Sequence, residues 1–188
     1  GDDSLDMIIT VNLLDRALTQ AMASGQLPKH ASTGYMGHFN YFIYVDGLTR
    51  KFDDPKVVPS SPHAKLLVKF EQIRSANHMD FTVDYRIKDS GYRDYYTVFN
   101  GHPVHILQTP LFSGIGESTS EAFRVRYETG SYSTSKDIVV YKGTFDNIVP
   151  TDEYEIYSFV PKIIGTDKQV RRWFFNERDF KYYTMKEQ

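Results

Sequence analysis

The fold is decided by residues 81–107, which read FTVDYRIKDSGYRDYYTVFNGHPVHIL. Apolar residues at positions 81, 83, 85 and 87 alternate with polar residues at 82, 84, 86 and 88, which is the period of a strand with one buried face. Residues 88–91 then predict a turn, and a second strand over 92–99 runs into Asn100-Gly101. Because Asn-Gly readily adopts the positive φ values of a type I′ turn, the stretch predicts consecutive antiparallel hairpins. Pro103 cannot donate to a ladder, so its strand should be an edge or irregular at that point.

The same pattern recurs from residue 35 to residue 184. We expect further strands over 39–45 and 48–52 (joined by Asp46-Gly47), 123–127, 138–142, 154–160, 170–175 and 180–183. The segment 39–45 is apolar on both faces and should be a central strand. Residues 64–74 fit either a strand or a helix, and we favour the strand. Sequential hairpins predict a mainly β fold (α+β by strict count), an antiparallel sandwich or a partly open barrel.

Residues 5–24 predict one amphipathic N-terminal helix packed on this β domain. Its apolar residues recur at three- and four-residue steps, and Ser4 and Gly25 fit its start and end. An alternative strand over 8–14 would be interrupted by Asn12, so we favour the helix. Because no stretch has the character of a linker, we predict a single domain over residues 1–188.

Composition excludes several classes of protein. The chain has 188 residues, 22 basic and 24 acidic side chains and no cysteine. Disulfides, thiolate catalysis and Cys-ligated zinc are therefore excluded, and the missing basic excess argues against nucleic-acid binding. No apolar run approaches the roughly 20 residues of a spanning helix, so no transmembrane segment is expected. The chain begins at Gly1 and not at Met, which we interpret as a processed or truncated chain, and we prefer an exported or cell-envelope location for this reason.

No motif predicts a metal, a cofactor or a catalytic residue. His102 and His105 are the closest pair among six histidines, but a three-residue spacing on a strand points them to opposite sides. Residues 113–119, SGIGEST, are spaced like a phosphate-binding loop but lack its lysine. We therefore expect a surface loop there and no bound cofactor.

Aromatic residues make up 15% of the chain, with 14 Tyr and 13 Phe. Whichever face of the strand over 92–99 points inward, some large rings are left on the other side, unless a second layer covers them. Rings with a polar tip suit ligand and protein interfaces. The candidate binding residues are Tyr92, Arg93, Tyr95, Tyr96, His102 and His105.

These observations favour a non-catalytic β-rich binding or assembly domain, possibly of an exported bacterial protein. It would contact a protein or carbohydrate ligand through an aromatic face or loops. Two alternatives stay open: an enzyme with a cleft lined by His102, His105, Glu153 and Glu155, and a viral or phage structural subunit. The oligomeric state stays open as well.

Overall fold

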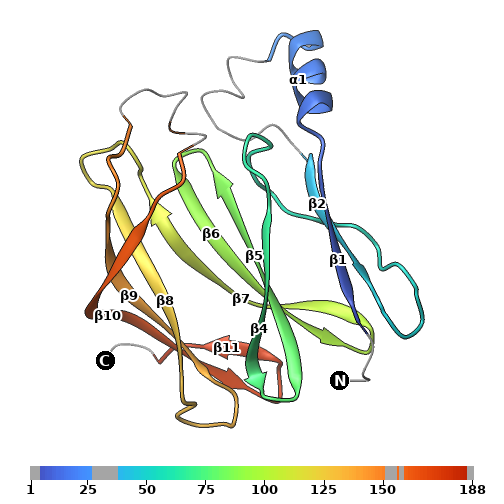
Figure 1. Cartoon of the computed structure of the whole chain (residues 1–188), viewed down its shortest axis with the longest axis vertical. Helices are drawn as coiled ribbons and strands as arrows, with labels where there is room; N and C mark the ends of the chain where they lie inside the picture. Colours follow the sequence, from blue (N-terminus) through green and yellow to red (C-terminus); the bar gives the residue numbers. More distant parts are fainter. Residues whose placement is uncertain (1–4, 27–37, 151–155, 157–158, 186–188) are drawn as a thin grey trace.

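A computed structural model describes residues 5–26, 38–150, 156 and 159–185, and most of these lie in strands (Figure 1). A three-stranded sheet has the order β1-β2-β3, and an eight-stranded sheet has the order β11-β10-β9-β8-β7-β6-β5-β4. The elements are β1 (Met7–Asn12), α1 (Leu14–Ala23), β2 (Asn40–Val45), β3 (Lys56–Val57), β4 (Leu67–Ser75), β5 (His78–Ile87), β6 (Ser90–Phe99), β7 (His102–Ser113), β8 (Glu121–Glu128), β9 (Asp137–Phe145), β10 (Ile163–Asn176) and β11 (Lys181–Tyr183). All neighbouring strands are antiparallel, and neither sheet closes into a barrel. The predicted mainly β, antiparallel, sandwich-like fold is confirmed.

The β5–β6–β7 meander confirms the hairpin predictions. Asn100 and Gly101 have φ values of +52° and +77°, as a type I′ turn requires. Pro103 pairs with Val98 of β6, whereas β7 pairs with β8 only through Phe112 and Ser113. Among the described strands, none pairs with β7 at Pro103 on the side away from β6, in agreement with the prediction.

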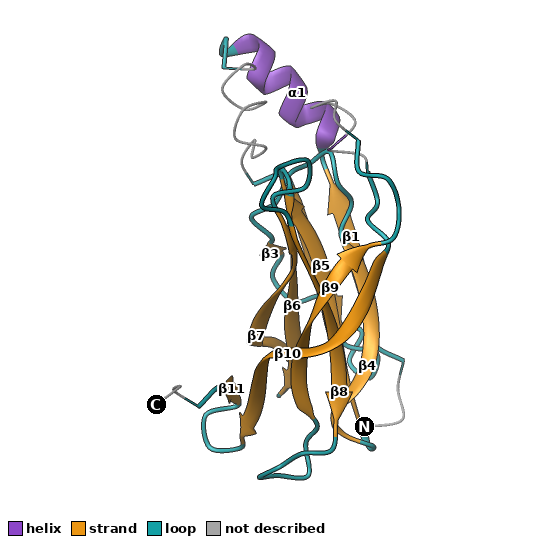
Figure 2. Ribbon diagram, turned by 90° about the vertical axis from the view of Figure 1, so that its left-hand side faces the viewer, coloured by secondary structure: helices purple, strands orange, loops and turns teal. Residues whose placement is uncertain are grey.

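The short β7–β8 ladder lets the large sheet bend, so that β8–β11 face β4–β7 (Figures 1 and 2). Buried side chains from both halves meet in one core. They include Ile73 of β4, Tyr95 of β6, Ile138 of β9 and Phe175 of β10. The backbone N–H of Lys136, in the β8–β9 loop, donates to the Ile73 carbonyl at 2.8 Å and joins the two halves at this end.

The small sheet covers the opposite face of β4–β7. Phe42 of β2 makes edge contacts with Phe81 and Tyr96, with ring centroids 5.6 and 5.1 Å apart. Val58 and Val83 are buried in the same cluster. The molecule therefore has three layers, β1–β3, β4–β7 and β8–β11, and β4–β7 form the middle layer with a core on each side.

The helix predicted over residues 5–24 is wrong in its first half. Residues 7–12 form β1, which pairs with β2, and the helix is restricted to Leu14–Ala23. Ile8, Ile9, Thr10 and Val11 are β-branched and favour the strand. Asn12 marks the boundary between the two elements, because its Oδ1 accepts a hydrogen bond from the Leu14 N–H at 3.1 Å.

The remaining part of the helix prediction is confirmed. Ala17 and Ala21 are buried against Leu18 and Phe39. Gly25 has a φ of +64°, the left-handed conformation that ends a helix. Figure 2 shows α1 extending beyond one end of the strands. Ser4 lies outside the described residues.

Five other predicted strands are confirmed. The strand predicted over 64–74 is β4, and those predicted over 123–127 and 138–142 are β8 and β9. The strands predicted over 170–175 and 180–183 are β10 and β11. The segment 39–45 is the central strand of the small sheet. The predicted return strand over 48–52 is wrong, because only Phe52 bridges to Val45 and β3 is the partner of β2. Asp46 accepts hydrogen bonds from the backbone N–H and hydroxyl of Thr49 and so stabilises a loop there. The strand over 154–160 falls largely outside the described residues.

Candidate functional site

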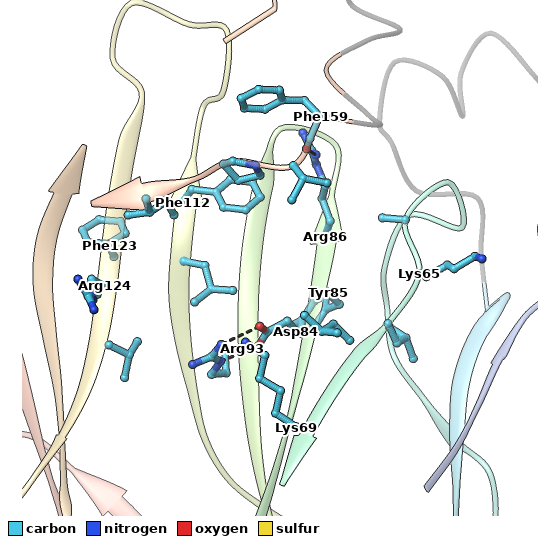
Figure 3. Close-up of a pocket in the computed structure, with 18 of the residues that line it drawn as sticks. Lys65, Lys69, Asp84, Tyr85, Arg86, Arg93, Phe112, Phe123, Arg124 and Phe159 are labelled. Atoms are coloured by element: carbon cyan, nitrogen blue, oxygen red, sulfur yellow. Dashed lines mark hydrogen bonds and ion pairs between the residues drawn. The ribbon is translucent and has the colours of Figure 1, made fainter. Parts of the chain in front are cut away.

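An open cleft of about 940 Å³ lies between the middle and third layers (Figure 3). We call it the interlayer cleft. It is lined by β4–β8 and by residues 159–163, which lead into β10. Leu67 of β4 lies at the cleft, whereas Ile73, six residues further along the same strand, lies in the filled core. The interlayer cleft is thus the part of the interlayer space that the side chains of the two halves leave unfilled.

Apolar side chains make most of its wall, and some remain exposed to solvent. Leu67 is 53% exposed and Val160 is 80% exposed. The other apolar residues of the wall are Ala64, Leu66, Leu111, Phe112, Phe123, Val125, Phe159, Pro161 and Ile163. Exposed apolar groups inside a concave surface are a usual feature of a ligand site.

The charged groups of the interlayer cleft are mostly cationic. Its lining includes five basic side chains, Lys65, Lys69, Arg86, Arg93 and Arg124, and one carboxylate, that of Asp84. The whole chain has a net charge of −2, so positive charge is concentrated locally. Arg93 donates to both oxygens of Asp84, from Nε at 2.5 Å and from Nη2 at 2.7 Å. Burial acts to lower the pKa of Arg93, but the hydrogen bonds and negative charge of Asp84 outweigh it and raise that pKa.

Arg86 fastens the segment that borders one end of the interlayer cleft. Its guanidinium donates to the backbone carbonyl of Lys88 at 2.5 Å, to that of Phe159 at 2.7 Å and to that of Ile156. It also lies 5.4 Å from the ring centroid of Phe112. Arg86 therefore has a structural task, because it holds Ile156 and Phe159 against β5 (Figure 3).

The three tyrosines of the sequence-predicted site lie in the two cores. Tyr95 is fully buried between the middle and third layers, 3.3 Å from the Thr109 hydroxyl, and burial raises its pKa to about 12. Tyr92 and Tyr96 point to the other face, toward the small sheet, where Tyr96 stacks on Phe81 with centroids 5.1 Å apart. A second layer therefore covers the surplus aromatic surface on each face. Of the predicted set, only Arg93 lines the interlayer cleft.

The two predicted histidines belong to separate pairs. Nδ1 of His102 lies 3.0 Å from the carboxylate of Asp53, and Nε2 of His105 lies 3.4 Å from that of Asp94. Burial acts to raise the pKa of Asp53, but hydrogen bonds from His102 and the backbone, with the charge of Lys56, leave that pKa below its usual value. Because each histidine has its own carboxylate, the structure does not bring the pair together.

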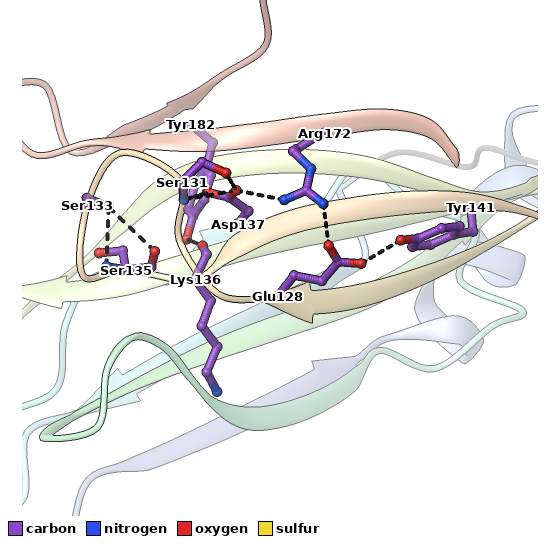
Figure 4. Close-up of polar contacts among 9 residues, drawn as sticks. All are labelled: Glu128, Ser131, Ser133, Ser135, Lys136, Asp137, Tyr141, Arg172 and Tyr182. Carbon is purple, nitrogen blue, oxygen red and sulfur yellow. Dashed lines mark hydrogen bonds and ion pairs between the residues drawn. The ribbon is translucent and has the colours of Figure 1, made fainter. Parts of the chain in front are cut away.

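A second polar cluster fastens the loop between β8 and β9 (Figure 4). The buried carboxylate of Asp137 accepts hydrogen bonds from the Ser131 hydroxyl at 2.6 Å and from Nη1 of Arg172 at 2.9 Å. Arg172 also donates to Glu128, which accepts from the Tyr141 hydroxyl. Both carboxylates are paired within the cluster, with Arg172 and with a hydroxyl group, so we interpret the cluster as structural.

No group of three or more metal-ligating side chains comes together in the parts of the chain that the structure describes. Glu153 and Glu155, which the enzyme alternative invokes, lie outside these parts. None of the described helices combines the length and hydropathy needed to cross a membrane. Comparison with protein-family models, curated proteins and solved structures found no match.

Sequence reasoning missed most of the interlayer cleft. Lys65, Leu67 and Lys69 alternate with the buried or half-buried Ala64, Leu66 and Val68. This alternation was visible in the sequence as a basic and apolar face of the strand predicted over 64–74. What it could not reveal is the opposite wall, which comes from β8 and from residues 159–163.

Proposed function

We propose that this chain is a binding domain that receives an apolar ligand in the interlayer cleft. The observation that supports the proposal is the unfilled space of about 940 Å³ between two layers that are otherwise packed together. Its volume is near the upper end of the range usual for small-molecule sites. The proposal keeps the binding class predicted from the sequence but moves the site from the aromatic residues to the cleft.

The exposed wall residues give the proposal an energetic basis. Full burial of a leucine side chain is worth about 1.5–3 kcal/mol, and Leu67 is only about half buried without a ligand. A ligand that covers Leu67 and Val160 would gain this hydrophobic free energy, and the surrounding β4–β8 ladders would present a largely preformed wall. The enzyme and structural-subunit alternatives stay predictions, and no arrangement of the described side chains favours either of them.

The proposal is tested by titrating the purified chain with N-phenyl-1-naphthylamine, a neutral apolar fluorophore. We expect saturable binding that Leu67→Gln weakens by about tenfold, the equivalent of about 1.4 kcal/mol. The matched control is Leu48→Gln, because Leu48 is 65% exposed in the loop that follows β2 and does not line the interlayer cleft. Absence of saturable binding, or equal weakening by both substitutions, would overturn the proposal.

A further inference from the structure

We propose that the ligand of the interlayer cleft is an amphipathic anion, with an apolar part and one acidic head group. This inference rests on the proposed function and adds the chemical class of the ligand. It is carried by the juxtaposition of the exposed Leu67 with two lysines, Lys65 and Lys69, on the same face of the chain at β4.

The register of the strands places these three residues. Leu67 pairs with Asp84 and Lys69 pairs with Thr82, so both side chains lie on the face of the middle layer that carries the Arg93–Asp84 pair. Lys65 precedes Leu67 by two residues and is also exposed. Lys65 and Lys69 therefore lie two residues before and two residues after Leu67, and both line the interlayer cleft.

Lys65, Lys69 and Arg124 are the basic side chains of the lining that remain available to a ligand within the described structure. Arg93 is held by both oxygens of Asp84, and Arg86 donates to backbone carbonyls. In contrast, neither lysine amine is paired with any group that the structure describes. Figure 3 shows Lys65 at the edge of the lining and Lys69 close to the Arg93–Asp84 pair. An acidic group could therefore stay partly hydrated near them while the apolar chain lies deeper.

The deeper wall supplies the apolar part of the site. Phe112, Phe123, Val125 and Ile163 line the cleft from β7, β8 and β10, on the side away from β4. An anionic head near β4 and an apolar tail toward β8 would match this division of charge and apolar surface. A cationic or neutral amphiphile of the same length would match only the apolar part.

The experiment compares dodecanoate, dodecanol and dodecylammonium below their aggregation limits, as competitors of the bound fluorophore at pH 7.5. Exposed ion pairs contribute about 0.2–1 kcal/mol each, so we expect dodecanoate to bind roughly tenfold more tightly than dodecanol. Dodecylammonium should bind most weakly. The preference for dodecanoate should shrink at high salt, because salt screens exposed charges.

The matched variants are Lys65→Gln/Lys69→Gln and, as a control with the same charge change, Lys168→Gln/Lys181→Gln. The control lysines are exposed on β10 and β11 and do not line the interlayer cleft. We expect the first variant alone to lose the roughly tenfold preference for dodecanoate while keeping its affinity for dodecanol and the fluorophore.

The outcomes separate this inference from the proposed function. Equal affinity for dodecanoate and dodecanol, tighter binding of dodecylammonium, or equal effects of the two double variants would overturn the inference and leave the fluorophore result standing. Fluorophore binding that none of the three amphiphiles displaces would also overturn it. Failure of the fluorophore itself to bind would overturn the proposed function.

Discussion

Replacing Asp137 by asparagine should destabilise the fold by about 3 kcal/mol. The Asp137 residue is 1% exposed, and its carboxylate accepts hydrogen bonds from the Ser131 N–H, the Ser131 hydroxyl and Arg172. Asparagine has the same size but offers one acceptor oxygen, so a donor must face the new amide N–H₂. Removing one partner of a buried ion pair lowers the free energy of unfolding by about 3–5 kcal/mol. We expect a loss at the lower end of this range, because Arg172 keeps its ion pair with Glu128.

The assay is equilibrium unfolding in urea, with the free energy of unfolding taken by linear extrapolation. The matched control is Asp167→Asn, because the Asp167 side chain is 99% exposed and lies 3.6 Å from Arg126. An exposed pair of this kind contributes at most about 1 kcal/mol, so the control should lose little stability. Equal losses in the two variants, or a loss below about 1 kcal/mol for Asp137→Asn, would refute the reasoning.

Four further predictions concern the core and one turn. Thr82→Val should leave the free energy of unfolding unchanged or raise it by up to about 1 kcal/mol, because the buried Thr82 hydroxyl has no hydrogen-bond partner in the described structure. Thr109→Val removes the hydrogen-bond partner of the Tyr95 hydroxyl and should lower the free energy of unfolding by about 1 kcal/mol. If urea unfolding showed the Thr82→Val protein to be less stable than the Thr109→Val protein, this reasoning would be wrong. Burial raises the pKa of Tyr95 to about 12, above the value of about 10 in an unfolded chain. The neutral Tyr95 hydroxyl therefore contributes fully to the free energy of unfolding below pH 10, and this contribution is lost as the pH rises through 12. The loss amounts to roughly 3 kcal/mol. Tyr95→Phe, which cannot ionise, should show a shallower decline of stability between pH 10 and 12 in urea titrations at each pH, and an unchanged slope would contradict this expectation. Gly101→Ala should lower the melting temperature through a loss of about 1 kcal/mol, because Gly101 has a φ of +77°, and an unchanged melting temperature would argue against the type I′ turn.

The β5–β7 meander could be predicted because its signals are local. Alternation of apolar and polar residues fixes the faces of β5, and the conformational preference of Asn100-Gly101 fixes the turn between β6 and β7. The return strand after Asp46-Gly47 was predicted from the same kind of signal and is wrong. There the chain does turn back, and the backbone N–H groups of Asp46 and Asp53 donate to the carbonyls of Lys51 and Tyr44, but the pairing is limited to the Val45–Phe52 bridge. A turn dipeptide therefore predicts a hairpin only where the flanking residues can pair.

The N-terminal segment shows why a periodic pattern can mislead at an element boundary. Met7, Val11, Leu14 and Leu18 fit one helical face, but the first two belong to β1 and the last two to α1. The strand is stabilised by pairing with β2, and the paired residues lie 28 to 38 positions apart in the sequence, which no local window contains. Asn12 looked like an interruption of a strand, and it is in fact the residue at which one element ends and the next begins.

The aromatic residues explain the architecture around the interlayer cleft. β6 carries Tyr92 and Tyr96 on one face and Tyr95 on the other, so burying these rings requires another layer of the protein on each face of the strand. The three-stranded sheet covers one face, so the second cover has to come from the large sheet itself, which requires the bend where β7 and β8 share only two residue pairs. The two halves pack where Ile73 and Tyr95 fill the space between them, and the cleft lies near Leu67, where the side chains leave that space unfilled.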